Sequence, residues 1–478
     1  MLFNSIDFAI FLPIVFALYW FVTNRNLKLQ NLLIIVSSFV FYGWWDWRFL
    51  FLMVGTASVD FVVGILLSKQ EIKRKRKILL SYSIIANLGI LAFFKYFNFF
   101  ADNFASAFTI FGVKLNPVSL QIVLPVGISF YTFQALSYTI DVYRKKLEPT
   151  KSIIDFFAFI SFFPQLVAGP IERATNLLPQ FYKKRTFDYS KAVDGMRQIL
   201  WGLFKKIVIA DNCAEYANLI FDHSPEYSGS TLVLGAIFFT FQIYGDFSGY
   251  SDIAIGTSRL FGFELMRNFN FPYFSRDMAE FWRRWHISLS TWFRDYLYFP
   301  LGGSRGGTWL KVRNTFIIFI VSGFWHGANW TFIVWGTLNA IYFLPLLLTN
   351  KNRNNLEIVA QGKLFPNVKE LSFMLLTFGL TVFAWIFFRA ENIGHALSYI
   401  SGILSPSLFT LPEILPKTKI LLVFVFVLIE WFGRQHQYAI CSLGTNWYKP
   451  FRWALYCVFL FSIFYFTGKE QQFIYFQF

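Results

Sequence analysis

Two histidines stand in stretches where a titratable side chain is unexpected. His286 lies in FWRRWHISLS, residues 281–290, among large aromatic rings and two arginines. His326 lies in GFWHGANW, residues 323–330, inside a run from residue 317 to residue 348 that contains no Lys, Arg, Asp or Glu. An ionisable group in such an apolar run is costly, and by default it marks a functional site. A neutral imidazole with an unperturbed pKa of about 6.5 can take a proton from a hydroxyl group that attacks a thioester carbonyl.

Two imidazoles at different positions could divide this chemistry between them. One would activate the nucleophile, while the other would position the acyl oxygen or protonate the leaving group. Both residues also have structural interpretations, because His286 could hydrogen-bond within a belt of Arg and Trp side chains and His326 could join two helices. A metal site is not expected, since neither histidine has a second His or a carboxylate three or four residues further on.

The residues around His286 have helical periodicity. On a helical wheel the large rings of residues 282–296 gather in one arc, and Arg284 and Asp295 lie opposite them. We therefore predict one amphipathic helix over Trp282–Tyr296, close to an interface, with His286 at the edge of its aromatic face.

A third polar cluster, YGDFSGYSD at residues 244–252, follows an apolar run. Asp246 and Asp252 are six residues apart and would not share a helix face, so we do not expect them to form an acid/base pair. Asp246, Ser248 and Ser251 could line a polar path, or they could cap a helix that begins after the glycines. The side chains that we expect along a substrate channel are Gln134, Asp246, Ser248, Ser251, Arg283, Trp325 and Asn329.

The composition indicates a membrane protein. Of 478 residues, 56% are apolar and only 15% are charged, whereas about a quarter of the residues in a soluble domain are charged. A bilayer core of roughly 30 Å needs about 20 apolar helical residues. The clearest runs of this kind are Ile78–Phe94, Val118–Ile140, Thr315–Leu348 and Leu371–Phe388. Shorter or interrupted runs are Phe8–Val22, Leu32–Trp45, Phe49–Leu67, Phe156–Ile171, Thr231–Gly245, Ile420–Ile429 and Trp453–Thr467.

These runs are continuous rather than alternating, which excludes the strands of an outer-membrane barrel. We predict an all-α polytopic protein with about 11 transmembrane or re-entrant segments. We expect a single embedded domain over residues 1–478, with a motif-dense core at about 118–348, because the one soluble-looking insert, Asn350–Glu370, is too short to fold alone. Any chemistry must then be carried by residues within the membrane.

Two of the apolar segments contain helix-breaking residues. Val118–Ile140 has Pro125 and Gly127 near its middle, and FFPQLVAGPIER, residues 162–173, contains Pro164 and the pair Gly169–Pro170. Irregular backbone at membrane depth is tolerated only where protein covers it or where it lines a cavity. The two breaks therefore indicate a pocket inside the helical bundle.

The net charge of +16 reflects basic loops rather than a nucleic-acid site. Lys and Arg accumulate in the cytoplasmic loops of membrane proteins, and three such loops are Asn24–Gln30, Lys69–Lys77 and Arg144–Lys151. If all three are cytoplasmic, the N-terminus lies outside and the donor side of the chemistry is the cytoplasmic face. The same loops favour anionic lipid headgroups or a phosphate-bearing cofactor. The three cysteines have no CxxC or metal spacing and indicate neither a disulfide framework nor a zinc site.

Five sequence blocks follow one another along the chain. They are PVGISFYTFQALSYTIDVYR, FFPQLVAGPIER, YGDFSGYSDIAIGTSRLFGF, FWRRWHISLSTWFRDYLYFPLGG and VSGFWHGANWTFIVWG. Together they closely resemble the membrane-bound O-acyltransferase family, specifically its bacterial alginate O-acetyltransferase-like branch. The initial MLFNSIDFAIFLPIVFALYW, the late FFRAENIGHA and the terminal FIYFQF are similar to the same branch, so the resemblance spans nearly the whole chain.

The resemblance implies a helical bundle ringed around a central funnel that joins the cytoplasmic donor side to the outer face. His326 matches the family's intramembrane histidine, the expected catalytic base, and His286 matches a second polar position of the active site. The donor would be a cytoplasmic thioester, for this branch acetyl-coenzyme A (acetyl-CoA). The acetyl group would pass to a cell-surface or secreted polysaccharide such as alginate, cellulose or peptidoglycan, directly or through an extracytoplasmic partner protein. The expected location is the bacterial inner membrane, with membrane lipids and no nucleic acid among the partners.

Three alternatives have distinct expectations. A sister branch D-alanylates teichoic acids and takes its acyl group from a small acyl carrier protein, but GFWHGANWTF and FWRRWHISLS look more like the polysaccharide-acetylating branch. A transporter of lipid-linked glycans would move its substrate without acylation. A non-catalytic scaffold for an extracytoplasmic acetyltransferase would tolerate alanine at both His286 and His326.

Overall fold

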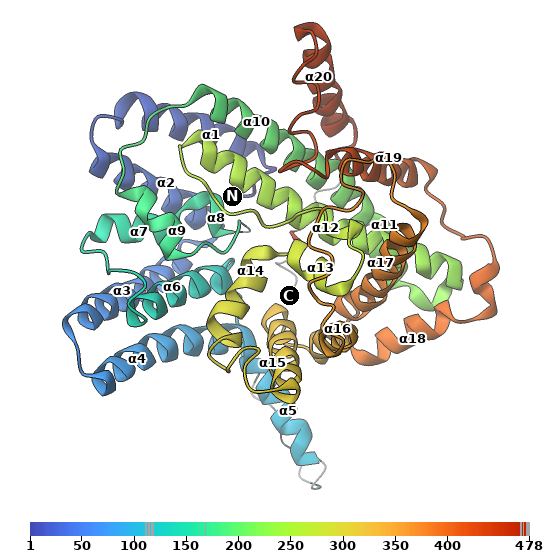
Figure 1. Cartoon of the computed structure of the whole chain (residues 1–478), viewed down its shortest axis with the longest axis horizontal. Coiled ribbons are helices and arrows are strands. Elements are labelled where there is room, and N and C mark those ends of the chain that lie inside the picture. The colour runs from blue at the N-terminus through green and yellow to red at the C-terminus, as the bar shows by residue number, and fades with distance from the viewer. Residues whose placement is uncertain are drawn as a thin grey trace. The chain divides into compact units, whose positions relative to one another are not determined.

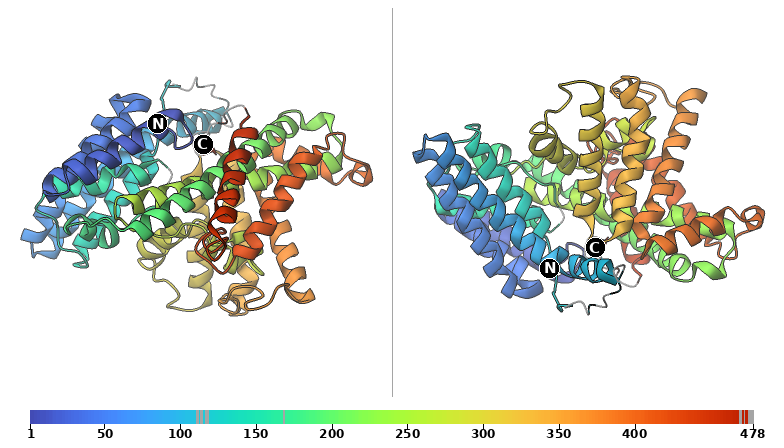
Figure 2. Two further views of the ribbon diagram at one scale, coloured as in Figure 1. Left: turned by 90° about the horizontal axis from the view of Figure 1, so that it is seen from above. Right: turned by 90° about the horizontal axis from the view of Figure 1, so that it is seen from below.

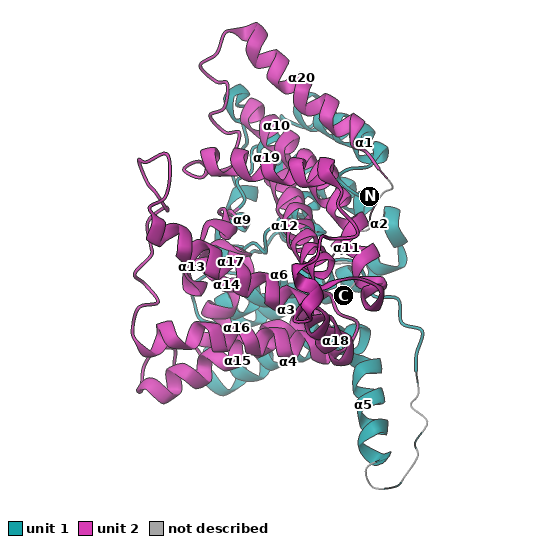
Figure 3. Cartoon of the chain, turned by 90° about the vertical axis from the view of Figure 1, so that its right-hand side faces the viewer, with its two compact units in different colours: residues 1–191, 258–265 teal, residues 192–257, 266–478 magenta. Residues whose placement is uncertain are grey.

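The computed structural model describes residues 1–109, 112, 115, 119–167, 169–468, 471 and 473–474 (Figure 1). The described part of the chain is helical and contains no β-strand, which confirms the predicted all-α class. Two compact units divide the chain (Figure 3): unit 1 comprises residues 1–191 and 258–265, and unit 2 comprises residues 192–257 and 266–478.

Six helices among the described residues are long and apolar enough to cross a bilayer. They are α2 (Leu27–Asp46), α3 (Arg48–Lys69), the continuous helix α4–η2–α5 (Lys73–Thr109), α12 (Gly229–Leu260), α16 (Trp330–Leu348) and α17 (Val368–Arg389). On α17, Leu375 and Leu376 are 62% and 58% exposed. Large apolar side chains on a helix surface fit contact with lipid rather than with water, and the chain is a multi-pass membrane protein. The total of about 11 embedded segments stays a prediction.

One buried carboxylate joins three helices of unit 1. Asp60 on α3 is fully buried and accepts hydrogen bonds from Ser83 and Asn87 on α4 and from Thr139 on α6. Interhelical hydrogen bonds of this kind hold membrane helices together where lipid removes the hydrophobic driving force. The remaining helices of this unit are α1 (Ile6–Ala17), η1 (Leu18–Val22), α6 (Ile128–Tyr143), α7 (Ile153–Ser161), α8 (Phe163–Leu166) and α9 (Ala174–Phe181).

Both breaks predicted in this part of the chain are present. Gly127 has a φ of 73°, a left-handed conformation suited to glycine, and α6 begins directly after it. Pro164 occupies the first turn of the short α8, where a missing N–H costs no helical hydrogen bond. Two residues of the predicted segments, Val118 and Ala168, lie outside the described residues, as does the terminal 475–478 of the FIYFQF motif.

The remaining helices belong wholly or mainly to unit 2. They are α10 (Tyr189–Leu203), η3 (Phe204–Ala210), α11 (Asp211–Asp222), η4 (Ser224–Glu226), η5 (Pro272–Phe274), α13 (Met278–Arg284), α14 (Ile287–Phe293), η6 (Arg294–Tyr298), α15 (Thr308–His326), α18 (Ile393–Ile403), η7 (Pro406–Phe409), α19 (Lys417–Gly433) and α20 (Lys449–Tyr465). Within this unit α15, α16 and α17 pack side by side (Figure 2).

The long run Thr315–Leu348 forms two helices, α15 and α16, rather than the single segment read from its hydropathy. The two helices cross closely at Gly323 and Gly336. A Cβ atom on Gly323 would lie 2.2 Å from the Phe332 carbonyl oxygen, and one on Gly336 would lie 2.3 Å from the Phe319 carbonyl oxygen. Small residues allow two helix backbones to approach this closely. The backbone of α16 thus lies directly against Gly323, three residues before His326.

Candidate active site

His286 lies at a break between α13 and α14. Its backbone has φ 42° and ψ 56°, a left-handed conformation that residues other than glycine seldom adopt. The continuous amphipathic helix predicted over Trp282–Tyr296 is therefore wrong. Two short helices replace it, and the imidazole stands at the corner between them.

The break has a long-range cause. The Ile287 N–H donates to the Asn268 carbonyl at 2.9 Å, and the Asn270 N–H donates to the Arg284 carbonyl at 2.9 Å. These bonds pair residues 268–270, which precede α13, with the corner itself. A helical wheel contains no information on such pairing, because it considers only residues within the helix.

The His286 imidazole is buried within an aromatic cluster. Its residue is 1% exposed, the Phe247 ring stands perpendicular to it with ring centroids 4.6 Å apart, and the Trp325 ring centroid is 6.3 Å away. His286 lies outside the candidate spans, and burial lowers its pKa to about 3. Burial disfavours the charged form, so the imidazole is neutral at physiological pH. The sequence placed it at the rim of an aromatic face, and the fold buries it completely.

His326 is the last residue of α15 and is 4% exposed. Three aromatic rings surround it edge-on: the ring centroids of Trp325, Trp335 and Phe388 lie 5.0, 5.2 and 5.3 Å from the imidazole centroid. Trp325 is therefore a neighbour of both histidines. The fold brings His286, His326 and Trp325 into one aromatic cluster, although 40 positions separate the histidines in the sequence.

The three polar residues predicted on the 244–252 segment lie in the middle of α12, which continues unbroken to Leu260. The helix-cap alternative for Asp246, Ser248 and Ser251 is therefore wrong, since no helix begins there. All three side chains are buried, with residue exposures of 3%, 1% and 2%.

Two adjacent lysines of η3 meet the acidic residues of α12. The Lys205 ammonium lies 2.5 Å from Asp252 and donates to Ser248 at 2.9 Å. The Lys206 ammonium lies 2.9 Å from Asp246 and 2.8 Å from Asp211. We did not predict these lysines as site residues. Their position in the apolar stretch GLFKKIVIA was the signal that could have identified them.

A small cavity of about 10 Å³ lies beside this network in unit 2. Its polar lining comprises Lys205, Tyr244, Ser248, Ser251, Asp252, Arg267, Asn268, Glu430, Gln437 and Tyr438. A volume of this size is close to the minimum that holds one water molecule. Asn268 connects the polar residues of α12 with His286. Its Nδ2 donates to Ser251 at 3.1 Å, and its Oδ1 lies 3.0 Å from Nδ1 of His286.

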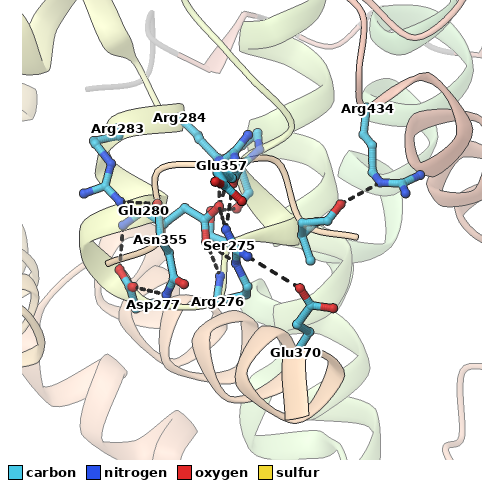
Figure 4. A network of polar contacts seen from close by, with 12 residues as sticks. Ser275, Arg276, Asp277, Glu280, Arg283, Arg284, Asn355, Glu357, Glu370 and Arg434 are labelled. Atoms are coloured by element: carbon cyan, nitrogen blue, oxygen red, sulfur yellow. Dashed lines mark hydrogen bonds and ion pairs between the residues drawn. The ribbon is translucent and has the colours of Figure 1, made fainter. Parts of the chain in front are cut away.

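Arg283 binds the loop between α16 and α17 (Figure 4). Its guanidinium is exposed and donates to the carbonyls of Asn352 and Asn355 at 2.7 and 2.6 Å. Arg276 and Arg284 donate to the Glu357 carbonyl of the same loop. The insert that looked soluble in the sequence is thus fastened to α13, and the contacts of Arg283 are those of a loop anchor.

The other two predicted channel residues also make structural contacts. Asn329 caps α16, since its Oδ1 accepts from the Thr331 N–H at 3.0 Å, and its Nδ2 donates to the Glu391 carbonyl at 2.7 Å. Gln134 belongs to α6 of unit 1, where its amide nitrogen, Nε2, donates to the Phe159 carbonyl at 2.8 Å. Neither contact involves the two histidines.

The described residues contain no group of three or more His, Cys, Asp or Glu side chains placed to hold a metal ion. The site instead offers two buried imidazoles, aromatic walls and buried ion pairs. An imidazole in surroundings of low polarity can accept a proton from a hydroxyl group and return it to a leaving group.

Comparison with known proteins identifies the family. Residues 142–387 match the membrane-bound O-acyltransferase family. The probable alginate O-acetylase AlgI of Pseudomonas aeruginosa is 38% identical over 445 residues, which are 92% of this chain and 82% of that protein. The chain belongs to the membrane-bound O-acyltransferase family. As a member of the family it is an acyltransferase that uses an acyl donor. The matched range contains both histidines and every predicted channel residue except Gln134.

Two further relatives of this O-acyltransferase bear on its branch. The peptidoglycan O-acetyltransferase of Helicobacter pylori is 35% identical over 431 residues, which are 84% of this chain and 79% of that protein. The teichoic acid D-alanyltransferase of Streptococcus thermophilus is 29% identical over 265 residues, which are 51% of this chain and 62% of that protein. The likeness to the polysaccharide O-acetylases is thus both closer and longer.

Proposed function

We propose that this O-acyltransferase transfers an acetyl group from acetyl-CoA at the cytoplasmic face to a hydroxyl group of a cell-surface or secreted polysaccharide. The transfer is direct or passes through an extracytoplasmic partner protein, and the enzyme resides in the bacterial inner membrane. The observation that carries the proposal is the extended similarity to relatives named for alginate and peptidoglycan O-acetylation. The basic loops of the sequence support a cytoplasmic donor side, because they are typical of that side.

His326 is the proposed catalytic base. Its imidazole takes the proton of the acceptor hydroxyl as the hydroxyl oxygen bonds to the thioester carbonyl carbon. When the tetrahedral intermediate collapses, the carbon–sulfur bond breaks and the proton passes to the leaving thiolate, which departs as a thiol. The residue is 4% exposed and has three aromatic side chains around it, so little of the imidazole surface is open to a substrate in this structure.

D-alanyl transfer from an acyl carrier protein is the second candidate. The D-alanyltransferase relative supports it, but that similarity covers only 51% of this chain. The two candidates differ in the donor, so they can be separated by offering each donor to the same preparation.

The test uses purified protein in liposomes that contain a trapped polysaccharide acceptor and, where required, the partner protein. Labelled acetyl-CoA is supplied outside, and label on the trapped acceptor is measured for the wild type, for His326→Ala and for His223→Ala. His223 is a histidine on an exposed corner after α11, 55% exposed as a side chain, and it serves as the matched control. We expect transfer by the wild type and His223→Ala and loss of at least about 100-fold in His326→Ala, the range of a lost general base.

Undiminished transfer by His326→Ala would show that the catalytic assignment is wrong. Label delivered from a D-alanyl carrier protein but not from acetyl-CoA would favour the second candidate. Movement of unmodified glycan across the bilayer would identify a transporter.

A further inference from the structure

We propose that Asn268 is a positioning residue that holds His286 as the tautomer protonated on Nδ1. The lone pair of the imidazole then resides on Nε2, so His286 acts on a substrate as a hydrogen-bond acceptor. The inference rests on the proposed function for its catalytic meaning, while the tautomer itself is independent of turnover.

The orientation of the Asn268 amide follows from its neighbours. Its Oδ1 accepts from the backbone N–H of Ser288 at 3.3 Å and from the Ser288 hydroxyl at 2.9 Å. A backbone N–H can only donate, so the amide atom that faces it must be the oxygen. The amide nitrogen then points the other way, where its Nδ2 donates to the Ser251 hydroxyl at 3.1 Å.

The amide orientation decides the proton of the imidazole. Nδ1 of His286 lies 3.0 Å from Oδ1 of Asn268, and an amide oxygen has no proton to donate. Nδ1 must therefore carry the hydrogen of this bond. A neutral imidazole carries one N–H, so Nε2 is the nitrogen that accepts.

The surroundings hold this arrangement in place. Asn268 is fully buried and His286 is 1% exposed. The Ile287 N–H donates to the backbone carbonyl of Asn268, and this bond fixes the asparagine against the corner that carries the imidazole. Side chain and backbone of one residue thus set both the place of the ring and its tautomer.

The assignment narrows the division of labour between the two histidines. A neutral His286 with its only N–H committed to Asn268 has no proton to offer to the acyl oxygen. It can accept a hydrogen bond from a donor group of a substrate and so orient that group, while His326 takes the proton of the hydroxyl. One of the roles considered for His286 was to position the acyl oxygen by donating a hydrogen bond to it. A neutral His286 with this tautomer cannot fill that role.

The first experiment reads the tautomer directly. The protein is labelled with ¹⁵N-histidine, reconstituted in lipid nanodiscs, and the His286 signals are assigned by their disappearance in His286→Gln. We expect the wild type to carry the proton on Nδ1, and Asn268→Ala to lose this preference. Asn339→Ala is the matched control, because Asn339 is 2% exposed and donates to the Trp335 carbonyl of its own helix.

The second experiment measures kinetics in the acetyl-transfer assay. Asn268→Ala should lower kcat by about 100-fold, the cost of a misplaced catalytic group, with the KM for acetyl-CoA changed by less than about twofold. Asn268→Asp keeps an oxygen for the Nδ1 proton and should retain more activity than Asn268→Ala. Its carboxylate also favours the imidazolium, so activity should fall on the acidic side of the pH profile.

The charged groups that line the cavity beside Asn268 are Lys205, Asp252, Arg267 and Glu430. These four groups are the same in Asn268→Ala and Asn268→Asp. A loss of kcat at acidic pH that occurs only in Asn268→Asp therefore reports the added carboxylate next to His286. A merely structural asparagine would give less folded protein in both variants and leave the pH profile unmoved.

The proposal is overturned if wild-type His286 carries its proton on Nε2, or if Asn268→Ala keeps both tautomer and kcat. The proposed function fails separately, through undiminished transfer by His326→Ala, and that outcome leaves the measured tautomer of His286 in place.

Discussion

Replacement of Lys206 by methionine should destabilise unit 2 severely. The Lys206 ammonium lies between the carboxylates of Asp211 and Asp246, at 2.8 and 2.9 Å, and the three side chains are 1%, 9% and 4% exposed. Methionine preserves most of the volume but removes the positive charge from two buried acids. Removing one partner of a buried ion pair costs about 3–5 kcal/mol, which is a large part of the roughly 5–15 kcal/mol that stabilises a typical protein.

An exposed ion pair of similar length supplies the control. The Lys191 ammonium lies 2.6 Å from Glu264, but these side chains are 53% and 67% exposed. Water and salt screen such a pair, so Lys191→Met should cost only about 0.2–1 kcal/mol. Because the substitution and the ion-pair distance are nearly the same, the difference between the two variants measures the effect of burial.

The assay is equilibrium unfolding of purified protein in mixed micelles, followed by tryptophan fluorescence. The double variant Lys206→Met/Asp246→Asn removes one of the two acids together with the lysine. It should recover part of the loss, with a coupling energy of about 0.5–3 kcal/mol between the two positions. The reasoning is refuted if Lys206→Met unfolds like the wild type but loses acetyl transfer, because Lys206 would then act on the substrates rather than on the fold.

Two other predictions concern helix packing and pH. Gly323→Ala should lower the unfolding temperature, because its Cβ would lie 2.2 Å from the Phe332 carbonyl oxygen. Gly379→Ala on α17, where a Cβ would meet nothing within 4 Å, should leave the unfolding temperature unchanged or slightly raised. Equal effects of the two substitutions would contradict the close crossing of α15 and α16. Burial lowers the pKa of His286 to about 3, so its imidazole is almost entirely neutral from about pH 5 upward. Replacing His286 should therefore remove no limb from the pH profile of kcat between about pH 5 and 8. A limb that disappears in His286→Gln would show that the ring is more hydrated than its burial implies.

Much of the fold followed from local properties of the sequence. Continuous apolar runs predicted membrane helices, since about 20 helical residues cross the hydrocarbon layer, and α2, α3, α12, α16 and α17 occupy such runs. The break before α6 was predictable from Gly127, because glycine tolerates the left-handed conformation found there. His326 was conspicuous for a similar reason, as an ionisable group within an uncharged run.

The candidate site was predictable only in part. The two histidines and Trp325 were identified, and they lie in one cluster. The roles of Arg283 and Asn329 were not predictable, because the carbonyls that they contact belong to loops beyond their own segments. Lys205 and Lys206 were not predicted as site residues, because their partners on α12 are about 40 positions away in the sequence.

The sequence by itself determined that the chain is a helical membrane protein, that its helices are interrupted at Gly127 and Pro164, and which imidazoles stand in apolar surroundings. These properties depend on residues that are neighbours along the chain, through hydropathy, periodicity and backbone freedom. The tertiary structure decided which nitrogen of His286 carries the proton and which lysine neutralises which aspartate. A hydrogen bond or a buried ion pair depends on distances of about 3 Å between segments remote in sequence, and only packing sets those distances.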